Sequence, residues 1–318
     1  MKSLPAILIC VVLWATAFPG IRAGLHGYSA FHLVVFRYGV AALALAVIAL
    51  FRRPAPLRRN DILRVAALGI LGFSLYPLAL TYGELTISAG TASVLVNLSP
   101  VFTALFAAGF LRERLSALSW CGIALAFAGA AVIALRGDHS LSLSAGALAV
   151  LLAAMTQGAQ FVLSKSLVKR YDPLTLTMYS VWFGTAADLL LSRGFVTAVR
   201  SASAEATLAI VFLGLFPTVI ATASWSHALQ RVDASFAAAF LYLIPPVAVL
   251  IGWLWLGEVP GIATIAGGCV AIFGVVLVRR GARVAISLPH ENAQARQLRR
   301  VSAGPRLHGH VRDVRSGG

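Results

Sequence analysis

Charged residues are scarce in this chain. Asp, Glu, Lys and Arg make up 12% of the 318 residues, against roughly 25% in a typical soluble domain, while hydrophobic residues make up 59%. A soluble protein of this length must cover its surface with polar side chains, and this composition does not provide them. It excludes a soluble catalytic domain and predicts an integral membrane protein.

Acidic residues are scarcer than basic ones: 11 Asp and Glu face 26 Lys and Arg, which gives a formal net charge of +15. A strongly basic chain can bind nucleic acid. Here, however, the basic residues lie in short links between apolar segments and in the last part of the chain, which is the distribution that membrane insertion produces. We therefore expect a lipid bilayer around the chain and no nucleic-acid partner.

Clusters of reactive side chains are also missing. The chain has no HExxH or GxSxG motif, no apolar segment with two acids, and seven scattered histidines. Intramembrane catalysis needs converging acids, bases, nucleophiles or metal ligands. Cys10, Cys121 and Cys269 lie in apolar runs without CxxC spacing and are expected to be packing residues. We expect no catalytic residue, metal or cofactor. An intramembrane enzyme or a non-transporting scaffold remains the alternative.

Ten apolar segments follow one another along the chain. They are residues 4–21, 31–51, 62–81, 91–111, 118–135, 144–164, 174–191, 206–227, 234–256 and 261–278. Each is close to the roughly 20 residues with which an α-helix crosses about 30 Å of hydrocarbon. The first segment also resembles a cleavable signal peptide ending in Ala15-Thr-Ala17, but its apolar run continues to Ile21. The expected fold class is an all-α membrane protein with ten transmembrane helices.

The positions of Lys and Arg predict the orientation of these helices. With a cytoplasmic N-terminus, the inner side receives twelve basic residues before the tail and the outer side four. This bias predicts a protein of the cytoplasmic membrane with both termini inside. Residues 282–318 are rich in Arg, Ser, Gly and His and are expected to form a disordered basic tail. Contact of that tail with anionic lipid and simple solvation are both open.

The chain repeats itself internally. After a shift of 145 residues, residues 69–133 align without a gap to 214–278, and eleven of the 65 pairs are identical, including Pro100 with Pro245. A shift of 143 residues relates the earlier parts more loosely. Each repeat has five helices, and because five is odd, the two halves must enter the membrane from opposite sides. Inverted repeats are typical of secondary transporters, whose site between the halves opens to either side.

Several short stretches carry a family resemblance. They are Trp14-Ala-Thr-Ala-Phe18, the run from Ser88 through Pro100 to Leu105, Leu111-Arg-Glu-Arg-Leu115 with Trp120-Cys-Gly122, and in weaker form Pro245 and Leu256-Gly-Glu258. These stretches resemble the EamA family of the drug/metabolite transporter superfamily over about residues 4–280. The resemblance implies two five-helix repeats around a central cavity lined mainly by helices 1, 3, 4, 6, 8 and 9. The chain departs from the pattern at Ala15, where the family often has Gly, and lacks a corresponding Trp near residues 155–157.

The repeat and the resemblance together define the expected organisation and function. The first repeat is expected over residues 1–137, the second over 138–281, and the tail over 282–318. We expect a secondary transporter that moves a small organic metabolite by alternating access, with efflux of an amino acid or a related neutral or zwitterionic solute as the best candidate. The shortage of buried charge argues against a multiply charged solute.

Polar and aromatic residues within the segments are the candidates for substrate binding, because a polar group in lipid is costly. Asn97 lies one turn before Pro100, whose ring removes a backbone hydrogen bond and frees a carbonyl. Its alternative role is a helix–helix hydrogen bond worth about 1 kcal/mol. The binding candidates are Trp14, Thr16, Tyr76, Asn97, Gln157, Gln160, Thr222 and Tyr242, and the helix-breaking or gating candidates are Pro100, Pro245, Glu113 and Glu258. For the aromatic members, core packing is the alternative.

Two charged residues fall well inside apolar segments: Arg37 in the second and Asp188 in the seventh. The sequence leaves a contact between them open. For Arg37 we expect the long side chain to reach the outer interface.

Overall fold

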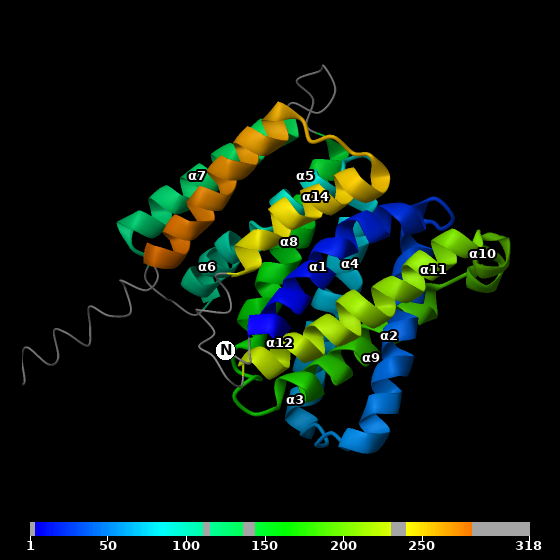
Figure 1. Ribbon diagram of the computed structural model, residues 1–318. Coiled ribbons are helices and arrows are strands. Elements are labelled where there is room, and N and C mark those ends of the chain that lie inside the picture. Colours follow the sequence, from blue (N-terminus) through cyan, green and yellow to red (C-terminus); the bar gives the residue numbers. More distant parts are fainter. Residues whose placement is uncertain (1–3, 111–114, 136–143, 230–239, 282–318) are drawn as a thin grey trace, which may run out of the picture.

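The computed structural model describes residues 4–110, 115–135, 144–229 and 240–281, and its elements there are all helices (Figure 1). Eight of the described helices are long and apolar enough to cross a membrane, and two further apolar helices are shorter. A helix satisfies its own backbone hydrogen bonds, which is what an apolar chain in lipid requires. The expected all-α class is confirmed, and the protein is a multi-pass membrane protein by helix length and composition.

The helices are of two kinds. Those without a break are α1 (Leu4–Leu25), α2 (Ala30–Arg52), α7 (Ala117–Leu135), α8 (Ala145–Ser164), α9 (Pro173–Leu191) and the helix Ile262–Gly281. Those with an irregular turn are α3 (Arg59–Ile70), η1 (Leu71–Leu75) and α4 (Tyr76–Gly83); α5 (Ala89–Val96) and α6 (Ser99–Phe110); α11 (Ala204–Leu213), η2 (Gly214–Ile220) and α12 (Ala221–Leu229); and η3 (Phe240–Leu243) with α14 (Ile244–Leu256). The short α10 (Phe195–Ser201) precedes α11. The segments η1 and η2 are π-helical, and η3 is a 3₁₀ turn.

Helix α1 runs through the core. It packs against α11, α12 and α14, while α8 packs against α4 and α6 (Figure 1). Ile7, Cys10 and Ala15 of α1 are buried. The first apolar segment is thus built into the bundle, which argues against its being a signal peptide. The cysteines behave differently from one another, because Cys10 is buried as expected but Cys121 and Cys269 are exposed.

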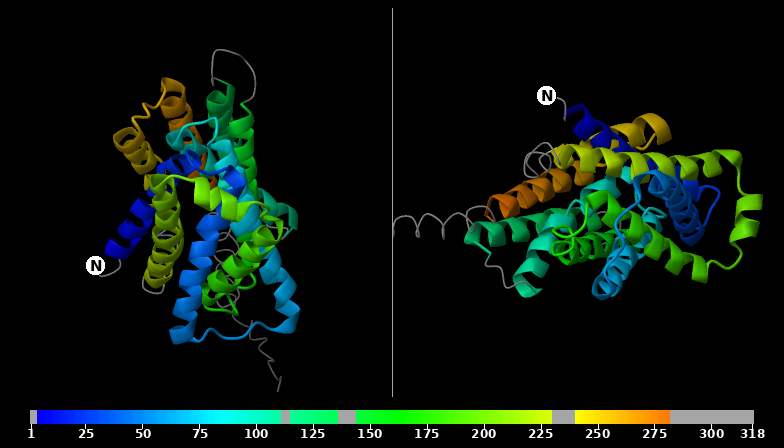
Figure 2. Two further views of the ribbon diagram at one scale, coloured as in Figure 1. Left: turned by 90° about the vertical axis from the view of Figure 1, so that its right-hand side faces the viewer. Right: turned by 90° about the horizontal axis from the view of Figure 1, so that it is seen from below.

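Glycines pair α7 closely with the helix Ile262–Gly281, and the two helices lie side by side in both figures (Figures 1 and 2). A Cβ on Gly122 would collide with the Gly274 carbonyl, and one on Gly129 with the Gly267 carbonyl. Small residues let helix backbones approach in lipid, where packing drives association. Since the earlier residue of one helix meets the later residue of the other, the two helices run in opposite directions.

A second pair of glycines makes contacts that recur along the chain. A Cβ on Gly69 would meet the Ser180 carbonyl of α9, and a Cβ on Gly214 would meet the Arg37 carbonyl of α2. Gly214 follows Gly69 by 145 residues, and Ser180 follows Arg37 by 143. The two spacings are those of the internal sequence repeat, so equivalent positions make equivalent contacts.

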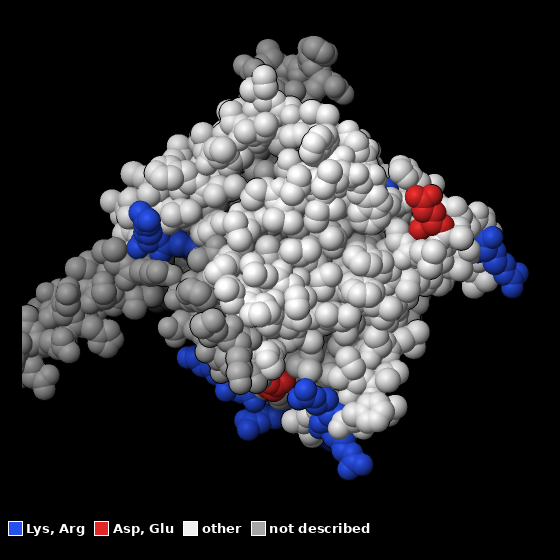
Figure 3. Space-filling model, viewed as in Figure 1, with Lys and Arg blue, Asp and Glu red and all other residues white. Residues whose placement is uncertain are grey.

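Basic residues gather at one end of the bundle, along the lower edge of Figure 3. The link from α2 to α3 meets the link from α8 to α9 there. Asp61 joins them, because its carboxylate accepts hydrogen bonds from Arg170 Nη1 at 3.0 Å and from the Tyr171 hydroxyl at 3.0 Å. The exposed basic residues of these links and of the adjoining ends of α2 and α3 are Arg52, Arg53, Arg58, Arg59, Arg64, Lys165, Lys169 and Arg170.

At the other end of α2, His32 Nε2 lies 3.0 Å from the Arg193 carbonyl that follows α9. The α2–α3 and α8–α9 links, both predicted on the inner side, thus lie at one end of the bundle. The start of α2 and the segment after α9, both predicted on the outer side, lie together at the other end.

Candidate functional site

The π-helical turn η2 is organised by Pro217. Proline has no N–H, so the Leu213 carbonyl four residues earlier loses its helical partner. The Thr218 hydroxyl donates to the same Leu213 carbonyl at 3.0 Å. Arg37 Nε then donates to Thr218 Oγ1 at 3.2 Å. Arg37 is only 8% exposed, so the expectation that it reaches the interface is wrong: a hydroxyl deep in the bundle holds its guanidinium instead.

Trp14 binds the same turn from α1. In η2 the Ala221 N–H donates to the Phe216 carbonyl, five residues back, instead of to Pro217. The indole Nε1–H of Trp14 donates to the Pro217 carbonyl at 3.1 Å, and its ring lies 5.4 Å from that of Trp225. A π turn leaves a carbonyl without its α-helical partner. Trp14 therefore shows the aromatic packing that was its alternative role, together with a hydrogen bond to the backbone, and substrate binding by Trp14 stays a prediction.

The turn η1 shows the same backbone pattern. The Tyr76 N–H donates to the Leu71 carbonyl, five residues back, so the Gly72 carbonyl loses its α-helical donor. Gln160 of α8 lies directly against Gly72, and a Cβ there would overlap its side-chain amide. Gln157, on the same face of α8, pairs with the Tyr76 hydroxyl. Three candidate residues, Tyr76, Gln157 and Gln160, thus meet where α8 crosses η1 and α4.

Asp188 belongs to the η1 side of the molecule. Its Oδ1 accepts a hydrogen bond from the Ser74 hydroxyl at 2.5 Å, and the side chain is 2% exposed. Arg37 and Asp188 make no ion pair with each other. Both lie near Tyr38: the Arg37 guanidinium is 5.2 Å from the centre of its ring, and the Asp188 carboxyl interacts electrostatically with its hydroxyl. The open contact between the two charges is therefore resolved: each has a hydroxyl partner of its own.

The two proline-containing helix starts are irregular, as expected. The helix ends at Val96, Asn97 and Leu98 form a turn, and a new helix begins at Ser99, next to Pro100. The Asn97 amide nitrogen donates to the Ser93 carbonyl of the preceding turn at 2.8 Å and not to another helix, which was its alternative role.

In the second half, Tyr242 lies in η3 before Pro245, and the Arg279 guanidinium lies 5.3 Å from the centre of its ring.

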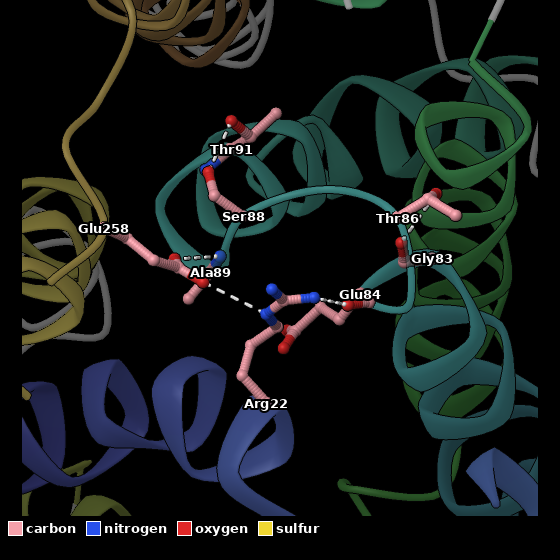
Figure 4. A network of polar contacts seen from close by, with 8 residues as sticks. All are labelled: Arg22, Gly83, Glu84, Thr86, Ser88, Ala89, Thr91 and Glu258. Carbon is pink, nitrogen blue, oxygen red and sulfur yellow. Dashed lines mark hydrogen bonds and ion pairs between the residues drawn. The ribbon is translucent and has the colours of Figure 1, made fainter. Parts of the chain in front are cut away.

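The remaining candidates have mixed positions. The Thr16 hydroxyl donates to the Leu13 carbonyl of α1 at 2.7 Å, and Thr222 is half-buried in α12. Glu113 lies outside the described residues. Glu258 accepts from Arg22 Nε at 3.0 Å and from the first backbone N–H of α5, that of Ala89, at 2.9 Å (Figure 4).

The sequence analysis named Glu258 as a helix-breaking or gating candidate but did not identify Arg22 as its partner. It also missed the roles of Ser74 and Thr218. The signal for those two was a hydroxyl residue near a proline, since Thr218 follows Pro217 directly and Ser74 precedes Pro77 by three residues. Within the described residues, no group of three His, Cys, Asp or Glu could hold a metal ion.

Comparison with known proteins identifies the family. The model of the EamA-like transporter family matches residues 1–135 and 144–280. The chain belongs to the EamA-like transporter family. It is 41% identical over 282 residues to a "Probable terminal-alkyne amino-acid exporter" of Streptantibioticus cattleyicolor, covering 88% of this chain and 94% of that one. It is 38% identical to "Uncharacterized transporter YdfC" of Bacillus subtilis, covering 84% and 87%.

More distant matches agree. A "Riboflavin transporter" of Rhizobium johnstonii is 29% identical, covering 80% of each chain. A solved structure titled "Crystal structure of protein" aligns with a TM-score of 0.57 at 19% identity, covering 89% of this chain and 98% of its own. This structural likeness shows the fold alone. Family and relatives together make this EamA-like chain a membrane transporter.

Proposed function

We propose that the protein exports a small neutral or zwitterionic organic solute, such as an amino acid, across the cytoplasmic membrane by alternating access. The observation that carries the proposal is the antiparallel pairing of α7 with the helix Ile262–Gly281 through glycines at equivalent positions. Two equivalent helices that cross a membrane in opposite directions are what an inverted repeat requires.

The proposed layout is ten transmembrane helices in two repeats, residues 1–137 and 138–281, followed by the basic tail 282–318. The recurring contacts of Gly69 and Gly214 support it. The shared basic end of the α2–α3 and α8–α9 links supports a cytoplasmic placement of both termini.

The proposed solute site lies between η1, η2 and the helices packed on them, α1 and α8. Each turn has polar side chains beside it: the indole of Trp14 at η2, and at η1 and the start of α4 the amides of Gln157 and Gln160 with the hydroxyl of Tyr76. The buried charges nearby, Arg37 and Asp188, are each engaged by a hydroxyl. Uncharged donors and acceptors of this kind suit a neutral or zwitterionic solute better than a polyanion. The name of the exporter that is 41% identical points the same way, toward an amino acid.

Counterflow in proteoliposomes tests this function. Vesicles containing the purified protein are loaded with one unlabelled solute and placed in the same labelled solute, for a panel of L-amino acids, an amino acid with a terminal-alkyne side chain, and riboflavin. We expect transient accumulation of one amino acid, recovered chemically unchanged by mass spectrometry. Recovery of a modified product would support the alternative of an intramembrane enzyme, and absence of exchange for the whole panel would contradict amino-acid transport.

A further inference from the structure

Four helix ends meet where Arg22 lies (Figure 4). Arg22, near the end of α1, donates through Nε to Glu258 Oε1 at 3.0 Å and through Nη1 to the backbone carbonyl of Glu84 at 2.5 Å. Glu258, after α14, also caps the start of α5 through the Ala89 N–H. The Arg22–Glu258 ion pair therefore ties α1, α5 and α14 together at the end of the link between α4 and α5. We call this ion pair the latch.

The carboxyl group of Glu84 lies beside the latch without taking part in it. Its side chain is 0% exposed, and neither carboxyl oxygen has a hydrogen-bond partner in the described part of the chain. A buried charge without hydrogen bonds is costly, whereas a protonated carboxylic acid is not charged. The site thus favours the protonated form of Glu84 while the latch is closed.

The charged groups around Glu84 also leave its protonated form favoured. Arg22 faces it from α1, Arg37 from α2 and Glu258 from the link after α14, while α8 meets this end of α4 through the uncharged Gly146 and Val150. The adjacent cation, Arg22, is already bound to Glu258. Burial, first, and the negative charge of Glu258 raise the pKa of Glu84 well above its usual range, although Arg22 and then Arg37 act to lower it.

We propose that Glu84 is a proton-binding site that couples the latch to protonation: it holds a proton while Arg22 is bound to Glu258 and releases it when the latch opens. On opening, the O–H bond of the Glu84 acid breaks and the proton passes to water. The guanidinium of Arg22, released from Glu258, then pairs with the new carboxylate. This inference rests on the proposed transport function, because a latch at one end of the bundle controls access only if a solute passes.

Infrared spectroscopy of the purified protein in lipid tests the proton site without a solute. The carbonyl stretch of a protonated carboxylic acid is followed as pH is raised. We expect the wild type to keep such a band at neutral pH, Glu84→Gln to lose it, and the matched variant of the exposed Glu205, Glu205→Gln, to retain it. Persistence of the full band in Glu84→Gln would overturn the proposal. Gln is isosteric with the protonated acid, so this variant is expected to fold.

Two further variants test the latch, with opposite expected signs. Glu258→Gln removes a negative charge and frees Arg22 for Glu84, so the midpoint of the band should fall by about 1 pH unit. Arg22→Gln removes a positive charge, so the midpoint should rise. Unchanged midpoints in folded Glu258→Gln, judged by its amide band, would overturn the link between latch and proton.

Coupling is measured with an amino acid that exchanges in counterflow. A pH gradient alone should drive its accumulation by the wild type and by Glu205→Gln, whereas Glu84→Gln should only equilibrate it. Accumulation by Glu84→Gln would overturn the coupling. If no amino acid exchanges, the proposed solute is wrong, while the infrared titration still decides the proton site.

Discussion

The two π-helical turns solve the same backbone problem with different side chains. In η1 the Ser74 hydroxyl donates to the carboxylate of Asp188 on α9, and in η2 the Thr218 hydroxyl accepts from the guanidinium of Arg37 on α2. The partner charge is negative in one turn and positive in the other. Pro217 lies inside η2, whereas no proline lies inside η1.

The two turns therefore share a backbone hydrogen-bond pattern but differ in the side chains that surround it. In each π turn a backbone N–H donates to the carbonyl five residues back instead of four, which leaves one carbonyl without its α-helical donor. A polar side chain from a facing helix contacts each turn: the Trp14 indole donates to the Pro217 carbonyl, and the Gln160 amide lies directly against Gly72. The two halves thus present unlike side chains at the proposed solute site.

Breaking the close helix approach beside the turns should have the largest effect. Gly69→Val and Gly214→Val place atoms against the backbone carbonyls of Ser180 and Arg37, which cannot move aside. We expect each to cost at least the roughly 1–3 kcal/mol of overpacking and to lower yield and thermal stability in detergent. Gly39→Ala of α2, whose Cβ would meet nothing within 4 Å, is the control. A stable Gly214→Val beside an unstable Gly69→Val would show that the two contacts are not equivalent.

Removing the Thr218 hydroxyl from η2 should destabilise the protein more than removing the Ser74 hydroxyl from η1. Thr218→Val loses two hydrogen bonds, to the Leu213 carbonyl and from Arg37, while Ser74→Ala loses one, to Asp188. Each bond to a charged group is worth about 1.5–3 kcal/mol, so Thr218→Val should lower the melting temperature more. Thermal unfolding followed by intrinsic fluorescence measures both. Equal melting temperatures would show that the Leu213 carbonyl is satisfied in another way.

Replacing the polar side chains that contact the two turns, Trp14 and Gln160, should affect transport more than folding. Trp14→Phe keeps an aromatic side chain but loses the hydrogen bond to the Pro217 carbonyl, worth about 1 kcal/mol of stability, and we expect counterflow to fall severalfold. Gln160→Leu should act similarly at η1. Trp120→Phe, at an exposed position of α7, is the matched control. Wild-type counterflow in Trp14→Phe would leave its indole N–H a purely structural group.

Asn97→Ala should have the smallest effect on folding, because among the described residues its amide donates to the Ser93 carbonyl one turn back and joins no second helix. We expect the variant to reach the membrane with a melting temperature near that of the wild type but to transport less. Tyr242→Phe, at the equivalent position before Pro245, is the comparison for the second half. Normal transport by Asn97→Ala would remove Asn97 from the site.

Prediction from sequence succeeded where local composition decides the structure. The all-helical class and the irregular backbone at Pro100 and Pro245 follow from apolar length and from the missing proline N–H. Arg37 was wrongly expected at the interface, because the sequence does not show that the Thr218 hydroxyl lies within its reach. The π turns were missed for a related reason, since a hydrogen bond shifted by one residue leaves the apolar pattern unchanged.

The sequence by itself determined that this chain is helical, apolar and repeated at a spacing of about 145 residues, because hydrophobic length and residue identity are local properties. It also determined the family. Only the tertiary structure decided which polar groups meet: Trp14 with Pro217, Ser74 with Asp188, and Arg22 with Glu258 rather than with the carboxyl of Glu84. The physical reason is that each buried polar group must find a partner across helices far apart in sequence, and packing alone sets which partners come within reach.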